Sequence, residues 1–247
     1  MTLFTRIIAA IRTAQWHMLL MELLVVAAGL FLGFQLDRWY EDRQDQVKAV
    51  RYIERLTVNI TEDLEVLERV RSLASIRLSY TELIHRASHD PDFVIEDPTE
   101  FVLATEQALY RFALVPHDAT FRELLANGDM ALLPEAIRDA LYAYHGELGV
   151  RTQFFSTYAN NQAEALRRFA GIIDFDQIDP FLSNPGRTRR QYSPEEAQVV
   201  LERLRQRPEA LAWLPRLRMG HQQTLWTTEI ALEKATEIKT LLESAGR

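Results

Sequence analysis

Residues 18–36 read MLLMELLVVAAGLFLGFQL, a run of nineteen positions that is apolar almost without interruption. A helix that crosses the ~30 Å hydrocarbon core of a bilayer needs about 20 residues of this kind. Trp16 precedes the run, and Trp39 and Tyr40 follow it. Because amphipathic aromatic side chains favour the level of the lipid headgroups, the run predicts a transmembrane helix with aromatic residues at both membrane interfaces.

Two other interpretations of this run have less support. The apolar core of a cleavable signal peptide is shorter, at ~7–15 residues, and is followed by a cleavage site of small residues. Residues 35–39 read QLDRW and hold no such site. A buried core helix of a soluble domain is the remaining alternative. We therefore expect a retained membrane anchor.

Four residues at the run share one helix face. Steps of 7, 4 and 3 residues lead from Glu22 to Gly29, Gly33 and Leu36, which lie together at 3.6 residues per turn. Small residues let a second helix backbone approach closely, and a carboxyl group in hydrocarbon requires a partner. The sequence thus predicts a helix–helix contact at Glu22, Gly29 and Gly33, for self-association or subunit docking. The open alternative is that the GxxxG spacing arose by chance and that Glu22 reaches headgroups or water.

The residues in and around the run follow an order that is similar to that of a known group of proteins. They are Gln15, Trp16, Glu22, Gly29, Phe31, Gly33, Gln35 and Trp39. This order resembles the span of a widespread family of uncharacterised single-span bacterial membrane proteins, although Arg38 and Tyr40 stand where that family often has asparagine. Residues 120–128, TFRELLANG, resemble a second block of the same family. Neither block is catalytic, and the resemblance implies no established activity.

The composition suits one folded domain behind the anchor. The chain has 247 residues, 47% of them hydrophobic and 26% charged, and its net charge is −7. The acidic excess lies after residue 36, and an acidic domain without a basic stripe argues against nucleic acid as a partner. The absence of cysteine excludes disulfides and thiol catalysis, and it suits either a periplasmic or a cytosolic setting.

The charges beside the span favour opposite orientations. Residues 1–17 form a short amphipathic segment in which no acid balances Arg6 and Arg12, and this favours a cytoplasmic N-terminus. The other flank holds more basic residues, but long domains cross the membrane largely regardless of charge. Members of the resembled family commonly have a strongly basic tail as well. We expect a bacterial inner-membrane protein with its N-terminus in the cytoplasm and its C-terminal domain in the periplasm.

The rest of the chain, residues 37–247, predicts an all-α domain. No proline occurs before Pro91, and no glycine lies between Gly33 and Gly128, so the span can continue as one helix to about residue 89. The apolar stripe that should face the core recurs at steps of 3, 4 and 7 residues. It comprises Ala49, Ile53, Leu56, Ile60, Leu64, Leu67, Ala74 and Leu78.

Further helices are expected from proline, Asn-Gly and capping signals. Asp97, Asp118 and Ser193 are N-cap residues by this interpretation, and Gly128 supplies a left-handed helix end. The expected helices cover residues 98–113, 119–126, 134–169, 194–206 and 208–244. The fold class is all-α: a transmembrane helix continues into a long helix, and an antiparallel helical bundle follows, in which the long first and last helices pack together.

The candidate catalytic and metal-binding patterns are weak. His85 and His89 are four residues apart on one helix face, but Arg86 stands beside them, and a polar helix end explains them better than a metal site. His117 and Asp118 have no nucleophile motif such as G-x-S-x-G near them, and Asp118 is explained as a helix cap. We therefore expect no catalytic residue, no metal and no cofactor.

Three other groups have two interpretations each. Residues 120–128 place Phe121, Leu124 and Leu125 in the core, or else they form a surface for a ligand or partner. The basic run is a solvated loop, or it contacts anionic headgroups or an acidic partner; it consists of Arg187, Arg189 and Arg190. A set of aromatic residues belongs to the core or lines a pocket between helices; it consists of Phe154, Phe155, Tyr158, Trp213 and Trp226.

The leading hypothesis is a membrane-anchored helical protein that is not an enzyme. It would act as a homo-oligomer, or as an accessory or scaffold subunit of a bacterial membrane assembly, with the lipid bilayer and other membrane protein subunits as partners. The alternative is a periplasmic small-molecule sensor bundle that passes its signal to a partner protein, since only residues 1–17 precede the span. A hydrolase whose site the sequence does not reveal is a third and weaker hypothesis.

Overall fold

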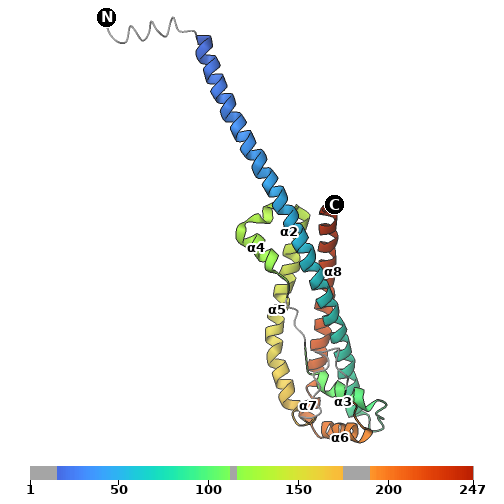
Figure 1. The fold of residues 1–247 in the computed structure, drawn as a ribbon. Coiled ribbons are helices and arrows are strands. Elements are labelled where there is room, and N and C mark those ends of the chain that lie inside the picture. Colours follow the sequence, from blue (N-terminus) through green and yellow to red (C-terminus); the bar gives the residue numbers. More distant parts are fainter. Residues whose placement is uncertain (1–15, 112–115, 175–189, 247) are drawn as a thin grey trace, which may run out of the picture. The chain divides into compact units, whose positions relative to one another are not determined.

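The computed structural model describes residues 16–111, 116–174 and 190–246, and this part of the chain is mostly helical, without strands (Figure 1). The chain divides into two compact units, Met1–Tyr52 and Ile53–Arg247. Most of the amphipathic segment expected over residues 1–17 lies outside the described residues.

The helix α2, Trp16–His89, includes the apolar run and continues far beyond it. Its length agrees with the prediction from the missing prolines and glycines. It ends shortly before Pro91, which has no N–H to donate. Arg205 caps the C-terminal end of α2: its guanidinium donates hydrogen bonds to the carbonyl oxygens of Ala87 at 2.9 Å and Asp90 at 2.6 Å. The last turn of a helix leaves carbonyl groups such as these without a helical partner.

The remaining helices lie in the unit Ile53–Arg247. They are α3, Pro98–Gln107; α4, Ala119–Asn127; the short 3-10 helix η1, Asp129–Leu132; α5, Glu135–Phe169; α6, Pro194–Arg205; α7, Pro208–Leu211; and α8, Leu214–Ala245. Two of these differ from expectation. The helix α3 ends at Gln107, earlier than the predicted residue 113. The helix expected over residues 208–244 is broken between α7 and α8, because Pro215 cannot donate to the carbonyl of Leu211 and so prevents a continuous helix.

The helix ends confirm most of the predicted caps. Asp97 accepts a hydrogen bond from the backbone N–H of Glu100 at 2.9 Å, and Ser193 forms a full capping box with Glu196. Gly128 ends α4 with a φ of 74°, a left-handed conformation that glycine adopts without steric cost. Asp118 occupies the predicted N-cap position of α4, but its side chain makes no capping hydrogen bond. Its carboxylate instead accepts from Arg122 Nε at 2.7 Å.

The inner face of α2 departs from the predicted stripe at its charged positions. Leu64 and Leu78 were expected in the core but are only half-buried. Asp63 and Arg77 are buried instead, with exposed fractions of 0% and 2%. The stripe is therefore rotated slightly from the predicted one, and it includes two charged residues that a purely apolar pattern assigns to the surface.

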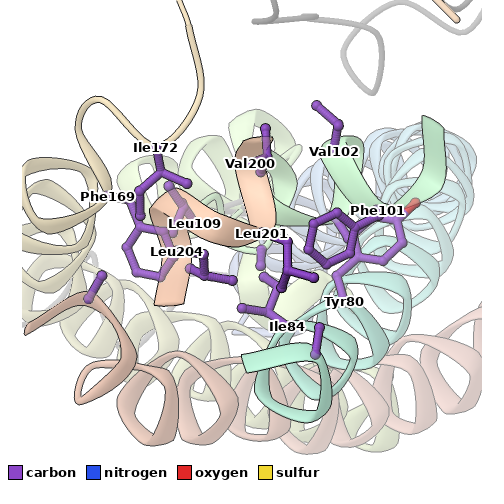
Figure 2. Packing of buried hydrophobic residues seen from close by; sticks show 14 of the residues in the cluster. Tyr80, Ile84, Phe101, Val102, Leu109, Phe169, Ile172, Val200, Leu201 and Leu204 are labelled. Carbon is purple, nitrogen blue, oxygen red and sulfur yellow. The ribbon is translucent and has the colours of Figure 1, made fainter. Parts of the chain in front are cut away.

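A hydrophobic cluster joins α3 and α6 to the C-terminal part of α2 (Figure 2). Every residue of α3 from Phe101 to Gln107 is buried, and Phe101 belongs to the cluster together with Tyr80 and Leu201. The helix α8 runs antiparallel to the neighbouring part of α2. Two observations at its ends show this: an added Cβ on Gly246 would lie 4.0 Å from Ile53, and Arg218 Nε lies 3.4 Å from Glu82.

Candidate functional site

The N-terminal part of α2 presents a long apolar surface. The large apolar side chains between Met21 and Leu36 are each exposed by 59–69%. They are Met21, Leu23, Leu24, Val25, Val26, Leu30, Phe31, Leu32, Phe34 and Leu36. Within the described part of the chain, α2 is the one helix that is long and apolar enough to cross a membrane. The predicted interface residues Trp39 and Tyr40 are exposed by 66% and 61%.

Gly29 and Gly33 lie on this surface. A Cβ atom added to either glycine would meet no atom of the chain within 4 Å. Within the described part of the chain, no contact with a residue outside the helix's own backbone therefore requires glycine at these two positions. For Glu22 and Trp16, which the sequence grouped with this surface, the structure describes the backbone but not the side chains.

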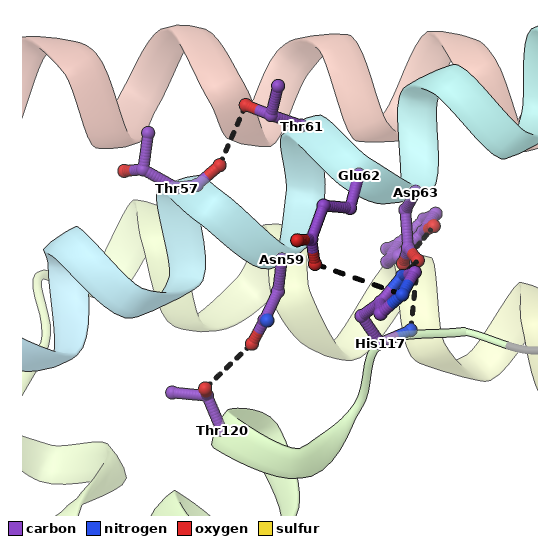
Figure 3. A network of polar contacts seen from close by, with 8 residues as sticks. Thr57, Asn59, Thr61, Glu62, Asp63, His117 and Thr120 are labelled. Atoms are coloured by element: carbon purple, nitrogen blue, oxygen red, sulfur yellow. Dashed lines mark hydrogen bonds and ion pairs between the residues drawn. The ribbon is translucent and has the colours of Figure 1, made fainter.

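A second candidate site is a polar cluster around Asp63 in the unit Ile53–Arg247. Its carboxylate accepts from the backbone N–H of His117 at 2.9 Å, from His117 Nδ1 at 2.8 Å and from the hydroxyl of Tyr144 at 2.8 Å (Figure 3). Because a carboxylate only accepts, Nδ1 of His117 carries a proton. The other ring nitrogen, Nε2, lies 3.8 Å from Glu62 Oε2 at the surface.

Residues 120–128 are held by the same face of α2. Thr120 donates to Asn59 Oδ1 at 2.7 Å (Figure 3), and Arg55 Nη2 lies 2.6 Å from Glu123 Oε2. Phe121 stacks on the ring of His145 in α5, with centroids 3.8 Å apart. Thr120 and Glu123 therefore attach α4 to α2, and Phe121 attaches it to α5. Phe121 and Leu124 are buried as expected, but Leu125 is 45% exposed, so the prediction that it enters the core is wrong.

The cluster attaches the segment around His117 to α2 and α5 through Asp63. Asp63 and His117 have the arrangement of an Asp–His pair, but the hydroxyl next to them belongs to Tyr144 and donates to Asp63, not to His117. Asp118, the neighbour of His117 in the sequence, pairs with Arg122. Sequence reasoning missed Asp63. The one feature of the sequence that points to Asp63 is its position on the same helix face as the apolar residues Leu56, Ile60 and Leu67.

Burial governs the ionisation of two histidines in this unit. It lowers the pKa of the His145 ring, against the opposing effect of Asp63 and Asp118. It lowers the pKa of His221 more strongly, to about 4. His221 is 1% exposed, and its Nε2 lies 2.9 Å from the carbonyl oxygen of Ala108. It is therefore a neutral, hydrogen-bonded core residue at pH 7.

His85 and His89 end α2 as polar residues close to one another. Their ring centroids are 4.2 Å apart, and His89 Nδ1 lies 2.9 Å from the carbonyl oxygen of His85. Across the described ranges, no three histidine, aspartate or glutamate side chains are grouped as a metal site would require.

The basic run is described only at its last residue. Arg190 lies 2.9 Å from Glu196 and above the ring of Tyr192, so its charge is met within the chain. Arg187 and Arg189 lie outside the described residues.

The aromatic set does not act as one group. The guanidinium groups of Arg168 and Arg216 both lie over the ring of Trp213, 4.8 and 4.5 Å from its centroid. Trp226, in contrast, is 61% exposed and does not belong to the core. For Phe154, Phe155 and Tyr158, the structure describes the helix backbone but not the side chains. The predicted shared core or pocket is therefore wrong for Trp226.

Comparison of the chain with protein-family models, with curated proteins and with solved structures found no match.

Proposed function

We propose that this protein is a single-pass anchor protein of the bacterial inner membrane, whose antiparallel helical bundle acts through protein contacts and not as an enzyme. The apolar surface of α2 carries this proposal. Covering one large aliphatic or aromatic side chain stabilises by about 1.5–3 kcal/mol, and ten such side chains are exposed between Met21 and Leu36. Leaving all of them in water would outweigh the ~5–15 kcal/mol by which a whole domain is stable, so lipid is their natural environment.

The proposed partner contact is the face of Glu22, Gly29 and Gly33. Because no contact among the described residues requires glycine at positions 29 and 33, a requirement for small residues there would come from a second helix. Helix association in lipid depends on close packing and polar contacts. The contact would join two copies of the chain, or join it to another subunit of a membrane assembly.

This contact is tested by substitutions around the span. Gly29→Ile and Gly33→Ile would hold two backbones apart and should abolish association of the chain in bacterial membranes, measured by co-purification of two differently tagged copies and by native size analysis. Ala27→Ile adds similar bulk on another face and should leave association unchanged. Association of Gly33→Ile equal to that of the natural chain would remove this face from the proposal.

The proposed orientation places the N-terminus in the cytoplasm and the bundle in the periplasm. Because the chain has no cysteine, a single cysteine reports its own location. Glu229 is exposed on α8, so Glu229→Cys should react with a membrane-impermeant maleimide in cells with a permeabilised outer membrane. A cysteine at Thr2 should react only after lysis. The reverse pattern would overturn the orientation but not the anchor.

A second candidate function is small-molecule sensing in the periplasm, and one cavity favours it. It has a volume of about 460 Å³ and lies between the ends of α3 and α5. Thr105 and Glu106 supply buried polar groups, and Leu109, Phe169 and Ile172 supply apolar walls. A few polar groups among apolar walls are typical of ligand pockets. Native mass spectrometry of the purified chain would support this function by a bound metabolite that Leu166→Trp, at the cavity, displaces.

A further inference from the structure

Beyond the apolar run, α2 exposes more large apolar side chains. Tyr40, Val47 and Val50 are exposed by 61%, 54% and 55%. Val47 lies eleven residues after Leu36, which is about 16 Å along a helix at ~1.5 Å per residue. If the hydrocarbon covers the run up to Leu36, it does not reach Val47 or Val50. These valines therefore lie in water, where lipid cannot cover them.

The exposed valines continue the predicted contact face of the span. Positions 26, 33, 40 and 47 are seven residues apart, and so are positions 29, 36, 43 and 50. The two series alternate at steps of 3 and 4, which is the a/d spacing of a coiled coil. We call these eight residues the α2 seam: Val26, Gly29, Gly33, Leu36, Tyr40, Arg43, Val47 and Val50.

We propose that the α2 seam joins two parallel copies of this chain from within the membrane into the water beyond it. The proposal rests on the proposed anchoring and names the partner as a second copy. Two copies inserted in the same orientation present the same residues at the same depth. The seam keeps the same heptad spacing from lipid into water. Only a helix with the same residues at the same depths matches it along its whole length, and an identical parallel helix has this property.

The charges of α2 support this pairing. Between residues 37 and 50 most charged side chains lie off the seam and its flanks; they are Arg38, Glu41, Asp42, Asp45 and Lys48. Lys48 pairs with Asp45 at 3.7 Å on the outer face. In a parallel pair the flanking residues meet at a separation of five positions, so Gln46 faces Arg51 of the second copy and Trp39 faces its Gln44. No like charges meet along these flanks.

Two charged residues are exceptions: Asp37 lies on a flank, and Arg43 stands on the seam itself. Two such guanidinium groups at one level repel each other, and their long stems must turn the charged ends toward water. The seam therefore predicts that Arg43→Leu strengthens the pair. If this surface of α2 faced only solvent, Arg43→Leu would not increase the association of two copies.

The test is cysteine crosslinking in the full-length chain, which has no cysteine of its own. Val47→Cys and Val50→Cys lie on the seam, and Lys48→Cys and Ala49→Cys beside it are the matched controls. Two differently tagged copies are expressed together, and the membranes are oxidised briefly. The two seam cysteines should form a disulfide dimer that carries both tags at least about 5-fold faster than the controls, as knobs-into-holes packing requires. Arg43→Leu should raise the yield from Val50→Cys further.

Each contrary outcome has a separate meaning. Crosslinking that is absent or equal at all four positions, with the chain in the membrane fraction, would overturn the parallel pair and leave the anchor intact. A crosslinked product that never carries both tags and whose mass differs from that of two copies would identify another protein as the partner and would also overturn it. Recovery of the chain in the soluble fraction would overturn the anchor and, with it, this pair.

Discussion

At the scale of single residues, Asp63 shows why a buried charge is tolerated in α2. Three donors from His117 and Tyr144 converge on its carboxylate, and a buried carboxylate is stable only when its acceptor sites are filled in this way. These partners lie 54 and 81 positions away in the sequence. No local pattern predicts such a pairing, which explains why sequence reasoning found the TFRELLANG block but not what holds it.

Asp63→Asn tests this role. The amide replaces one acceptor oxygen with a donor that faces other donors, so we expect the free energy of unfolding to fall by about 2–4 kcal/mol. Denaturant unfolding of the detergent-solubilised chain measures this change. Glu62→Gln removes a half-exposed carboxylate beside the same histidine and should cost less than ~1 kcal/mol. Equal effects of the two substitutions would show that Asp63 is not the centre of the cluster.

His221 makes stability depend on pH. Its pKa is about 4 in the folded chain and ordinarily about 6.5, so between these values the unfolded chain binds a proton that the folded chain does not. Stability is therefore lost as the pH falls from about 6.5 toward 4, by about 3 kcal/mol in all. His221→Gln can still donate to Ala108 and should flatten this part of the profile of unfolding free energy against pH. An unchanged slope would contradict the burial of a neutral ring.

At the scale of elements, periodicity predicts the helices well and their rotation less well. Missing prolines and glycines fix the extent of α2, and cap residues fix the starts of α3 and α6. The buried residue on the inner face of α2 is Asp63 and not, as the sequence predicted, the neighbouring Leu64. A search for apolar periodicity assigns a carboxylate such as Asp63 to the surface. The break before α8 arises from Pro215. The early end of α3 at Gln107 has no signal in the helix pattern.

The rotation of α2 is tested by comparing two neighbouring leucines. Leu67 is 0% exposed, and Leu67→Ala should lower the free energy of unfolding by about 2–5 kcal/mol through the cavity that it leaves. Leu64 is half-buried, so Leu64→Ala should cost clearly less. Thermal unfolding of both variants decides the matter, and a larger cost at position 64 would restore the stripe predicted from the sequence.

At the scale of the whole molecule, the apolar run determines the account of function. Its length, its aromatic flanks and the exposure of its side chains all favour lipid as its surroundings. The residues of the span could be predicted from the sequence because hydrocarbon thickness sets a minimum apolar length. The partner of α2 could not, because it depends on which surfaces remain uncovered after the chain has folded.

Extraction of the full-length chain from bacterial membranes at alkaline pH, followed by determination of its intact mass, tests the membrane anchor most directly. We expect the chain to stay in the membrane pellet, to be released only by detergent, and to retain residues 18–36. Leu24→Arg combined with Leu30→Arg places two charges in hydrocarbon, at roughly 2.5–3.5 kcal/mol each, and should move the chain to the supernatant, whereas Val47→Arg should not. Release of the natural chain into the alkaline supernatant, or a mass that lacks residues 18–36, would contradict the anchor.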